Sequence, residues 1–206
     1  MDEPVLVDGD RDARVTVVLA HGAGAGMEHP FLAEAASGLA ARGLRVVRFE
    51  FPYQNAARTG RRGAPDPMPV LQATMRDVVA ANAPPPFVLA GKSMGGRVAT
   101  TVADDLGAAG VVVFGYPFHP PKEPQRLRTA HLAALRTPTL ILQGERDPFG
   151  TREDVAGYAL SPSIEVAWFD DGDHSLAPRK KSGFTAEQHF ARAIDSAAAF
   201  VRRVTG

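Results

Sequence analysis

The segment "VLAGKSMGG", residues 88–96, places a serine between two glycines in the pattern G-x-S-x-G, from Gly91 to Gly95. In this pattern the serine occupies a sharp turn between a strand and a helix, which leaves its hydroxyl exposed. The residues before and after Ser93, "PFVLA" and "MGGRVATTVADDLG", predict that strand and that helix. Ser93 is therefore a candidate nucleophile for attack on a carbonyl carbon.

The same letters also contain Gly-Lys-Ser, which closes the phosphate-binding P-loop of many nucleotide-binding proteins. A P-loop needs a further glycine five positions before the Gly-Lys pair, and that position is Pro86. The segment before Gly91 also has the composition of a strand, and an extended chain does not wrap around phosphates. These residues argue against nucleotide binding, whereas a purely structural serine that caps a helix stays open until partners are found.

A serine nucleophile needs a histidine as proton acceptor and usually a carboxylate that orients the histidine, in the chain order Ser, acid, His in this type of site. The segment "LQGERDPFG" places Asp147 after the next-to-last predicted strand, and "DDGDHSL" places His174 after the last one. We expect Ser93, Asp147 and His174 to form a catalytic triad. The competing residues are Asp154, Asp170, Asp171 and Asp173 for the acid and His21, His29, His119, His131 and His189 for the base.

The loop "HGAGAGM", residues 21–27, follows the first strong strand and lets the backbone approach a ligand closely. A tetrahedral oxyanion needs two backbone N–H donors, one from the residue after the serine and one from such a loop. Met94 and Ala23 are the expected donors. A dinucleotide-binding loop is the alternative, but the loop lacks G-x-G-x-x-G, since His29 stands where the last glycine counted from Gly24 is needed.

Six short apolar runs alternate with amphipathic segments, which is typical of βαβ units and predicts a mostly parallel α/β sheet of about six or seven strands. The expected strands start at Val15, Leu44, Pro86, Gly110, Pro138 and Ser163, and "PVLV" from Pro4 is a candidate antiparallel edge. The expected helices start at Phe31, Val70, Met94 and Thr185, the last with Glu187 close behind its first residue. Helices should cover both faces, and no loop is long enough for a lid domain.

The 206 residues fit one domain, 1–206, and the 23 basic residues balance the 23 acidic ones, which argues against nucleic acid as a partner. The chain has no cysteine, no long apolar run and no signal-peptide pattern at its start. We therefore expect a cytoplasmic protein without membrane partner. No cofactor is expected. No metal is expected either, because "DDGDHS" does not continue into a calcium-binding loop.

Basic residues gather in the three loops that follow the second, fourth and sixth of these strands, at the edge where Ser93 should lie. They are Arg58, Arg61, Arg62, Lys122, Arg126, Arg128, Arg179, Lys180 and Lys181. One interpretation is that Arg61 and Arg62 bind an anionic substrate, because a guanidinium group matches a carboxylate or phosphate. The alternative is that all are solvated surface charges, offset by acidic residues in the same loops.

With these motifs the sequence resembles the α/β-hydrolase superfamily, within it the small lidless dienelactone-hydrolase-like group that includes the testis-expressed protein thirty relatives. The resemblance covers nearly the whole chain and rests on "HGAGAGMEHPF", "FEFPY", "GKSMGGRVA", "GYPFHPP", "PTLILQGERDPFG" and "DGDHSL". It implies a serine hydrolase of small acyl esters or thioesters, with the triad and oxyanion residues named above. Dienelactone hydrolases carry cysteine where this chain has Ser93. The alternative function is a non-catalytic module of this fold that binds a protein partner.

Overall fold

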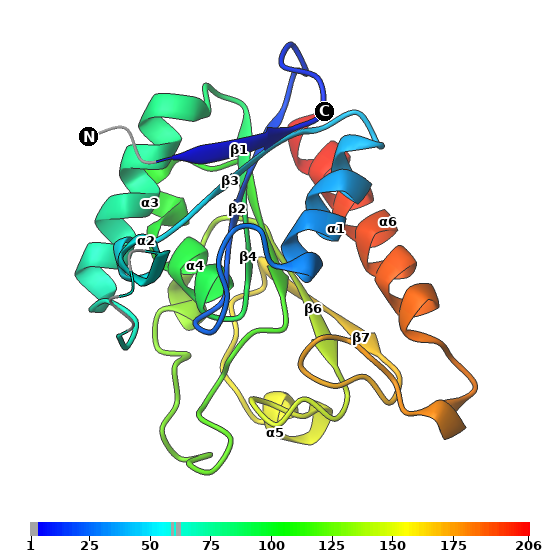
Figure 1. Ribbon diagram of the computed structural model, residues 1–206. Helices are drawn as coiled ribbons and strands as arrows, with labels where there is room; N and C mark the ends of the chain where they lie inside the picture. Colours follow the sequence, from blue (N-terminus) through cyan, green and yellow to red (C-terminus); the bar gives the residue numbers. More distant parts are fainter. Residues whose placement is uncertain (1–3, 59, 61–62) are drawn as a thin grey trace.

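The computed structural model describes residues 4–58, 60 and 63–206. Its centre is a seven-stranded sheet in the order β1-β3-β2-β4-β5-β6-β7 (Figure 1). The strands are β1 (Val5–Asp8), β2 (Thr16–Ala20), β3 (Arg45–Phe49), β4 (Phe87–Lys92), β5 (Gly110–Phe114), β6 (Thr139–Gly144) and β7 (Ile164–Phe169). Only β1 runs antiparallel to its neighbour, β3. The predicted α/β-hydrolase fold, including the antiparallel edge, is confirmed.

Helices cover both faces of the sheet, as predicted (Figure 1). On one face α1 (Pro30–Ala40) packs beside α6 (Ala186–Thr205), and on the other α3 (Met68–Asn82) packs beside α4 (Met94–Leu106). Alternate residues of β2 enter the two cores, Val17 the core under α1 and α6, and Val18 the core under α3 and α4. The central parallel strands are mostly apolar because both of their faces are buried.

Local signals explain where most helices begin. Thr185 caps α6: its hydroxyl accepts the Gln188 N–H at 3.2 Å, and the Gln188 side chain accepts the Thr185 N–H at 2.9 Å. The partner in this capping box is Gln188, and Glu187 lies in the first turn. Asp154 lies in the short helix α5 (Arg152–Ala156), which Thr151 caps.

The segment after β3 differs from the sequence prediction, which treated residues 51–69 as a loop. It contains a short helix, α2 (Pro52–Arg58), and the start of α3 at Met68. Proline at the first position of a helix favours its start. Seven residues are too few to show an apolar periodicity, so this helix had no signature in the sequence.

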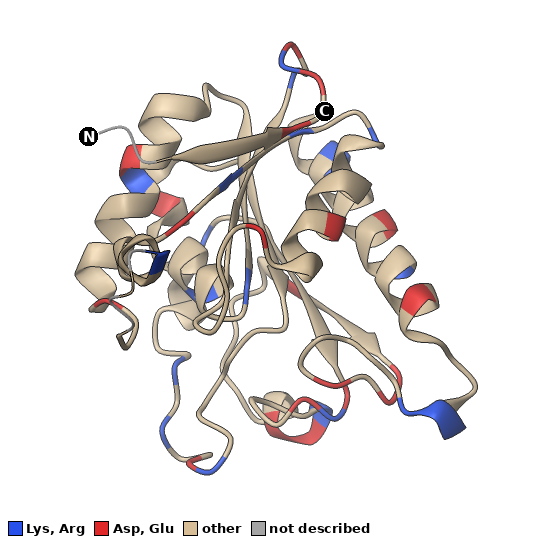
Figure 2. Cartoon of the chain, viewed as in Figure 1, with Lys and Arg blue, Asp and Glu red and all other residues tan. Residues whose placement is uncertain are grey.

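The connections at the carboxyl ends of the parallel strands meet at the lower edge of the sheet in Figure 1. Within the described residues, these connections hold short helices and turns and no lid domain. Basic and acidic residues lie close together in the loops around α5 and after β5 and β7 (Figure 2). This edge is where an open α/β sheet binds ligands.

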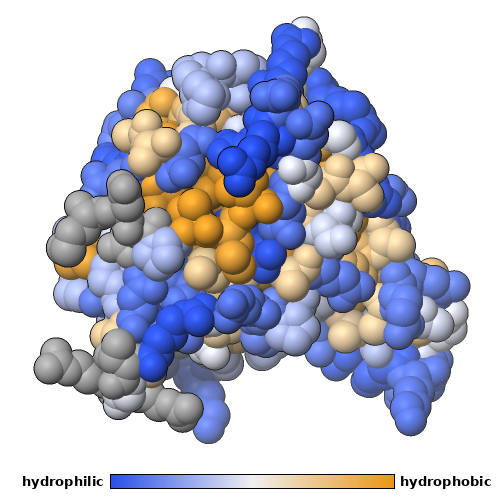
Figure 3. All heavy atoms as spheres, turned by 45° about the horizontal axis from the view of Figure 1, so that its top comes forward, coloured by the Kyte–Doolittle hydropathy of each residue, from blue (hydrophilic) through white to orange (hydrophobic). Residues whose placement is uncertain are grey.

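The opposite end of the molecule carries the edge strand β1. Figure 3, in which the top of Figure 1 comes forward, shows an apolar patch near the centre of the view, at the place of β1. Val7, a residue of β1, has 37% of its area exposed. Among the helices of the described residues, none combines the length and the apolar character needed to cross a membrane.

Helix α4 approaches β2 and β4 so closely that backbone lies against backbone. A Cβ atom on Gly95 would lie 2.6 Å from the carbonyl oxygens of both Ala20 and His21. A Cβ atom on Gly91 would lie 2.3 Å from backbone atoms of Gly95 and Gly96. Real side chains do not tolerate such distances, so both positions require glycine for close packing.

We expect Gly95→Ala to lower the free energy of unfolding by about 2 kcal/mol or more, because α4 must move away from β2 to make room for the methyl group. Urea denaturation measures this change. Gly24→Ala is the matched control, since a Cβ atom at Gly24 meets nothing within 4 Å. Equal stability of the two variants would contradict the packing argument.

Candidate active site

Ser93 lies at the turn between β4 and α4, at the carboxyl edge of the sheet. Its φ of 51° and ψ of −113° are unusual for a residue with a side chain. The backbone is held in this conformation because the Ser93 N–H donates to the Phe114 carbonyl at 3.1 Å and the Ser93 carbonyl accepts from the Arg97 N–H at 3.0 Å. The strained turn that the G-x-S-x-G pattern predicts is present, and it exposes the hydroxyl.

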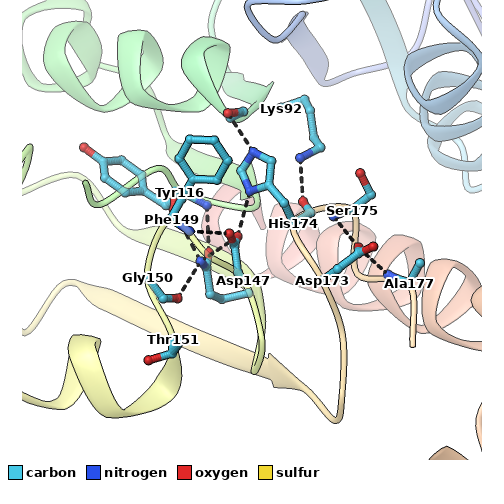
Figure 4. A network of polar contacts seen from close by, with 12 residues as sticks. Lys92, Tyr116, Asp147, Phe149, Gly150, Thr151, Asp173, His174, Ser175 and Ala177 are labelled. Atoms are coloured by element: carbon cyan, nitrogen blue, oxygen red, sulfur yellow. Dashed lines mark hydrogen bonds and ion pairs between the residues drawn. The ribbon is translucent and has the colours of Figure 1, made fainter. Parts of the chain in front are cut away.

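The structure brings Ser93, His174 and Asp147 together in one hydrogen-bonded chain. His174 Nε2 lies 2.8 Å from Ser93 Oγ, and His174 Nδ1 lies 2.7 Å from Asp147 Oδ2 (Figure 4). Because a carboxylate only accepts, Nδ1 carries the hydrogen and Nε2 is free to accept the serine proton. The ring of Phe149 lies against His174, with centroids 4.3 Å apart, and limits its rotation.

Asp147 is completely buried, at 0% exposure, and its charge is matched by several donors. Besides His174, the Phe149 N–H donates to Oδ1 at 2.9 Å and the Gln143 amide donates to Oδ2 at 2.9 Å. A buried carboxylate keeps its charge only when hydrogen bonds replace its hydration. These contacts hold the carboxylate in the orientation that His174 needs.

Gln143 is a residue that the sequence analysis missed. It lies in β6, and its buried amide joins two loops. Its Oε1 accepts from the Tyr116 N–H at 2.7 Å, while its Nε2 donates to Asp147 and to the Gly150 carbonyl at 3.1 Å. The only sequence signal was a polar side chain within the apolar run "TLILQG".

The loop that carries Ala23 is held by side chains behind it. The Gly22 carbonyl accepts from the His21 ring Nδ1 at 2.8 Å and from the Tyr53 hydroxyl at 3.3 Å. The same hydroxyl lies 3.0 Å from the Ala23 carbonyl. Since the Gly22 carbonyl and the Ala23 N–H belong to one planar peptide group, fixing the carbonyl also fixes the direction of the N–H.

His21 donates its hydrogen bond to the Gly22 carbonyl as a neutral ring. Its Nε2 accepts from the Phe51 N–H at 3.0 Å, so its other nitrogen carries the hydrogen donated to Gly22. Burial lowers the pKa of His21, which the hydrogen bond to Gly22 and the charge of Glu50 only partly oppose. His21 therefore belongs to the scaffold of the loop.

Ala23 and Met94 both line a cavity that also contacts Ser93. Met94 is the first residue of α4, and the first N–H groups of a helix have no partner within the helix. The arrangement therefore brings the two expected oxyanion donors to the same cavity as the serine hydroxyl.

Three of the four competing acids have other partners. Asp154 accepts from Thr151 at the start of α5, Asp171 pairs with Arg146 and Arg179, and Asp173 accepts from the Ser175 and Ala177 N–H groups. The competing histidines also make structural contacts. His29 caps α1, His131 contacts Thr100, His189 donates to Leu176, and His119 contacts Pro120.

The basic loops differ from the sequence hypothesis in one respect, because several of their charges are paired. Arg58 forms ion pairs with Glu50 and Glu28, at 2.7 Å and 2.9 Å. Arg126 pairs with Glu123 at 3.5 Å, and Arg179 pairs with Asp171. Arg61 and Arg62, the predicted substrate-binding residues, lie outside the described residues. The paired arginines match the alternative interpretation of surface charges offset by acids.

Lys92 precedes Ser93 and lies beside the hydrogen-bonded chain (Figure 4). Its Nζ donates to the His174 carbonyl at 2.6 Å and lies 5.6 Å from the centre of the Phe31 ring. Burial lowers the pKa of Lys92 from 10.5 to about 8, although the charges of Asp147 and Asp173 oppose this shift. The ammonium group is therefore held in place at a cost in stability.

This cost predicts a pH dependence. Between pH 8 and pH 10.5 the unfolded chain binds the Lys92 proton more strongly than the folded protein, so folding becomes more favourable as the pH rises through this window. Relative to Lys92→Met, the wild type should gain about 2 kcal/mol of unfolding free energy between pH 7 and pH 10. Urea denaturation of both proteins at the two pH values measures the gain. A difference that stays constant with pH would contradict the shift.

Comparison with known proteins identifies the family of this chain. A family described as "Alpha/beta hydrolase domain" matches residues 13–202. An α/β serine hydrolase without lid from Xanthomonas campestris is 20% identical, with 97% of this chain and 86% of that chain covered and a TM-score of 0.65.

Two further solved structures have the same fold. A dienelactone hydrolase from Anabaena variabilis is 18% identical over 97% of this chain and 90% of that chain, with a TM-score of 0.73. An esterase from Pyrococcus furiosus is 14% identical over 100% of this chain and 91% of that chain, with a TM-score of 0.72. At these identities the similarity concerns the fold, while the family match covers most of the sequence. The chain therefore belongs to the α/β-hydrolase domain family.

Proposed function

We propose that this protein is a serine hydrolase that cleaves small acyl esters or thioesters through an acyl-enzyme. The observation that carries the proposal is the continuous hydrogen-bonded chain from Ser93 Oγ through His174 to the buried carboxylate of Asp147. Each group has the environment that its role requires: an exposed turn, a ring fixed in one orientation, and a fully paired acid.

In the proposed mechanism the Ser93 hydroxyl attacks the substrate carbonyl while His174 Nε2 accepts its proton. Asp147 keeps the hydrogen on Nδ1 and stabilises the imidazolium that forms. The N–H groups of Ala23 and Met94 donate to the oxyanion of the tetrahedral intermediate. His174 then protonates the leaving alcohol or thiol. Water, activated by His174, releases the acyl group and restores Ser93.

Two cavities next to Ser93 provide space for the two parts of an ester. One, of about 360 Å³, lies between α3, α4 and the segment after β5. The other, of about 350 Å³, lies between the Ala23 loop, α1 and His174. Ser93 and Phe149 line both, so they lie at the boundary between them. Cavities of this size without a covering lid favour short, soluble esters.

Replacing a member of the triad should abolish labelling or turnover. We expect a fluorophosphonate probe to label the wild type and not Ser93→Ala, and we expect Ser93→Ala and His174→Ala to lower the turnover of a 4-nitrophenyl ester by about 10⁴-fold. Asp147→Asn should also lower turnover, because an amide does not hold the required tautomer. Circular dichroism checks that the variants fold.

The controls separate the proposed function from its alternative. Asp173→Asn changes an acid close to His174 that binds only backbone groups of its own loop, and it should stay active. A folded wild type that the probe does not label would favour a non-catalytic module that binds a protein partner. Full activity in Asp147→Asn would remove Asp147 from the triad.

The scaffold behind Ala23 gives a separate prediction. Tyr53→Phe removes the hydroxyl that donates to the Gly22 and Ala23 carbonyls and keeps the ring. We expect kcat to fall about threefold to tenfold with KM little changed, because the Ala23 N–H is then less well aimed at the oxyanion. Steady-state kinetics measures this split. Tyr158→Phe, which removes a tyrosine hydroxyl beyond α5, is the control, and an equal loss there would contradict the role of Tyr53.

A further inference from the structure

Two arginines line the cavity beside Ser93 that lies between α3, α4 and the segment after β5. Arg97 and Arg128 share this cavity with Ser93, Met94 and Phe149. Arg97 lies on α4 four residues after Ser93, and residues at this spacing lie on the same side of a helix. Arg128 comes from the long segment after β5. Two arginines from different parts of the chain thus line the cavity where Ser93 would react.

The structure holds Arg128 in a defined position. Its N–H donates to the Phe118 carbonyl at 2.7 Å, and its own carbonyl accepts from the Tyr116 hydroxyl at 2.9 Å. Both aromatic side chains are fully buried in the core. The backbone of Arg128 is therefore anchored on both sides, although it lies in a long irregular segment.

These two arginines differ from Arg58, Arg126 and Arg179 at the same edge, because neither forms an ion pair within the described residues. Arg58, Arg126 and Arg179 all form ion pairs. In the described part of the chain, neither Arg97 nor Arg128 has a carboxylate within ion-pair distance, and Arg97 Nε is buried without a hydrogen-bond partner there.

Besides burial, the positive charge of Arg97 lowers the pKa of two neighbouring side chains, Arg128 and His131. Burial lowers the pKa of Arg128, and the charges of Arg97 and Arg126 lower it further. Burial and the charge of Arg97 also lower the pKa of His131, which therefore stays neutral and adds no third charge. The two arginines are half-buried like charges that repel each other, and an anion between them would offset this repulsion.

We infer that Arg97 and Arg128 bind a carboxylate carried by the substrate, so that the enzyme prefers esters with a free acid group at the end remote from the scissile bond. This inference rests on the proposed hydrolase function and names its substrate class. Asp66 lines the same cavity. The charges of Asp66, Arg97 and Arg128 sum to one positive charge, which suits a monoanion better than a dianionic phosphate. Met68 and Leu71 provide apolar walls for the carbon chain between the two ends.

The test compares two esters that differ only in this acid, mono-4-nitrophenyl adipate and 4-nitrophenyl hexanoate. The wild type should have the higher kcat/KM for the adipate ester. In Arg97→Met and Arg128→Met, the ratio of the two kcat/KM values should fall about tenfold or more, as expected when a charge-assisted hydrogen bond is lost. Arg126→Met is the matched control, because Arg126 is exposed and pairs with Glu123, and its ratio should equal that of the wild type.

A binding measurement separates this inference from the proposed function. Monomethyl adipate, which is a monoanion like the ester substrate, should raise the melting temperature of Ser93→Ala, and adding Arg97→Met should remove the rise. Binding of monomethyl adipate without hydrolysis of either ester would overturn the proposed function and support the carboxylate site. Hydrolysis of both esters with the same ratio in wild type, Arg97→Met and Arg128→Met would overturn the inference and leave the hydrolase. A larger rise with inorganic phosphate than with monomethyl adipate would overturn the assignment to a carboxylate.

Discussion

The close approach of α4 to β2 and β4 is the constraint on which the candidate site depends. The missing side chains at Gly91 and Gly95 let the helix begin directly after Ser93, against the carbonyl groups of Ala20 and His21. This contact forces Ser93 into its positive φ and brings the loop after β2 beside it. It also directs the start of α4, with Met94 and then Arg97, toward the same cavity. One backbone contact thus positions the nucleophile, both expected oxyanion donors and one of the two unpaired arginines.

Burial of charge is the second condition that shapes the site. Asp147 is removed from water, and Gln143, Phe149 and His174 replace its hydration with hydrogen bonds. Lys92 lies nearby, and the charges of Asp147 and Asp173 only partly offset the loss of hydration of its ammonium group. Its pKa is therefore lowered. The protein still folds because the packing of the surrounding strands contributes far more to the free energy of folding than the dehydration of one ammonium group removes. The result is a histidine held from both sides: its ring by Asp147 and its backbone by Lys92.

The charges at the carboxyl edge of the sheet fall into two groups. Most arginines there neutralise acids of the same edge, such as Glu50 for Arg58 and Asp171 for Arg179. Although burial opposes ionisation of Glu50, the hydrogen bonds from Arg58 and Met27 hold the pKa of Glu50 below its ordinary value, and this ion pair supports the loop after β2. Arg97 and Arg128 remain as positive charge inside the cavity. Net charge counted along the sequence does not separate these groups, since both contribute equally to the sum.

The amino-acid sequence alone determined the strands, most helices and the members of the hydrogen-bonded chain. Apolar runs and helical periodicity are local patterns, and in a parallel sheet the residues just after the strands must meet at one edge, so Ser93, Asp147 and His174 were predictable from motif and chain order. The tertiary structure alone decided which side chains support them. Gln143 resembled any strand residue, Arg97 resembled a helix surface residue, and α2 was too short for a periodic signal. The partners of the loop arginines also lay beyond local reasoning, as with Arg58 and Glu28, which are 30 residues apart. Ion pairs and hydrogen bonds depend on the direction of side chains brought together by folding, and that direction has no local signature in the sequence.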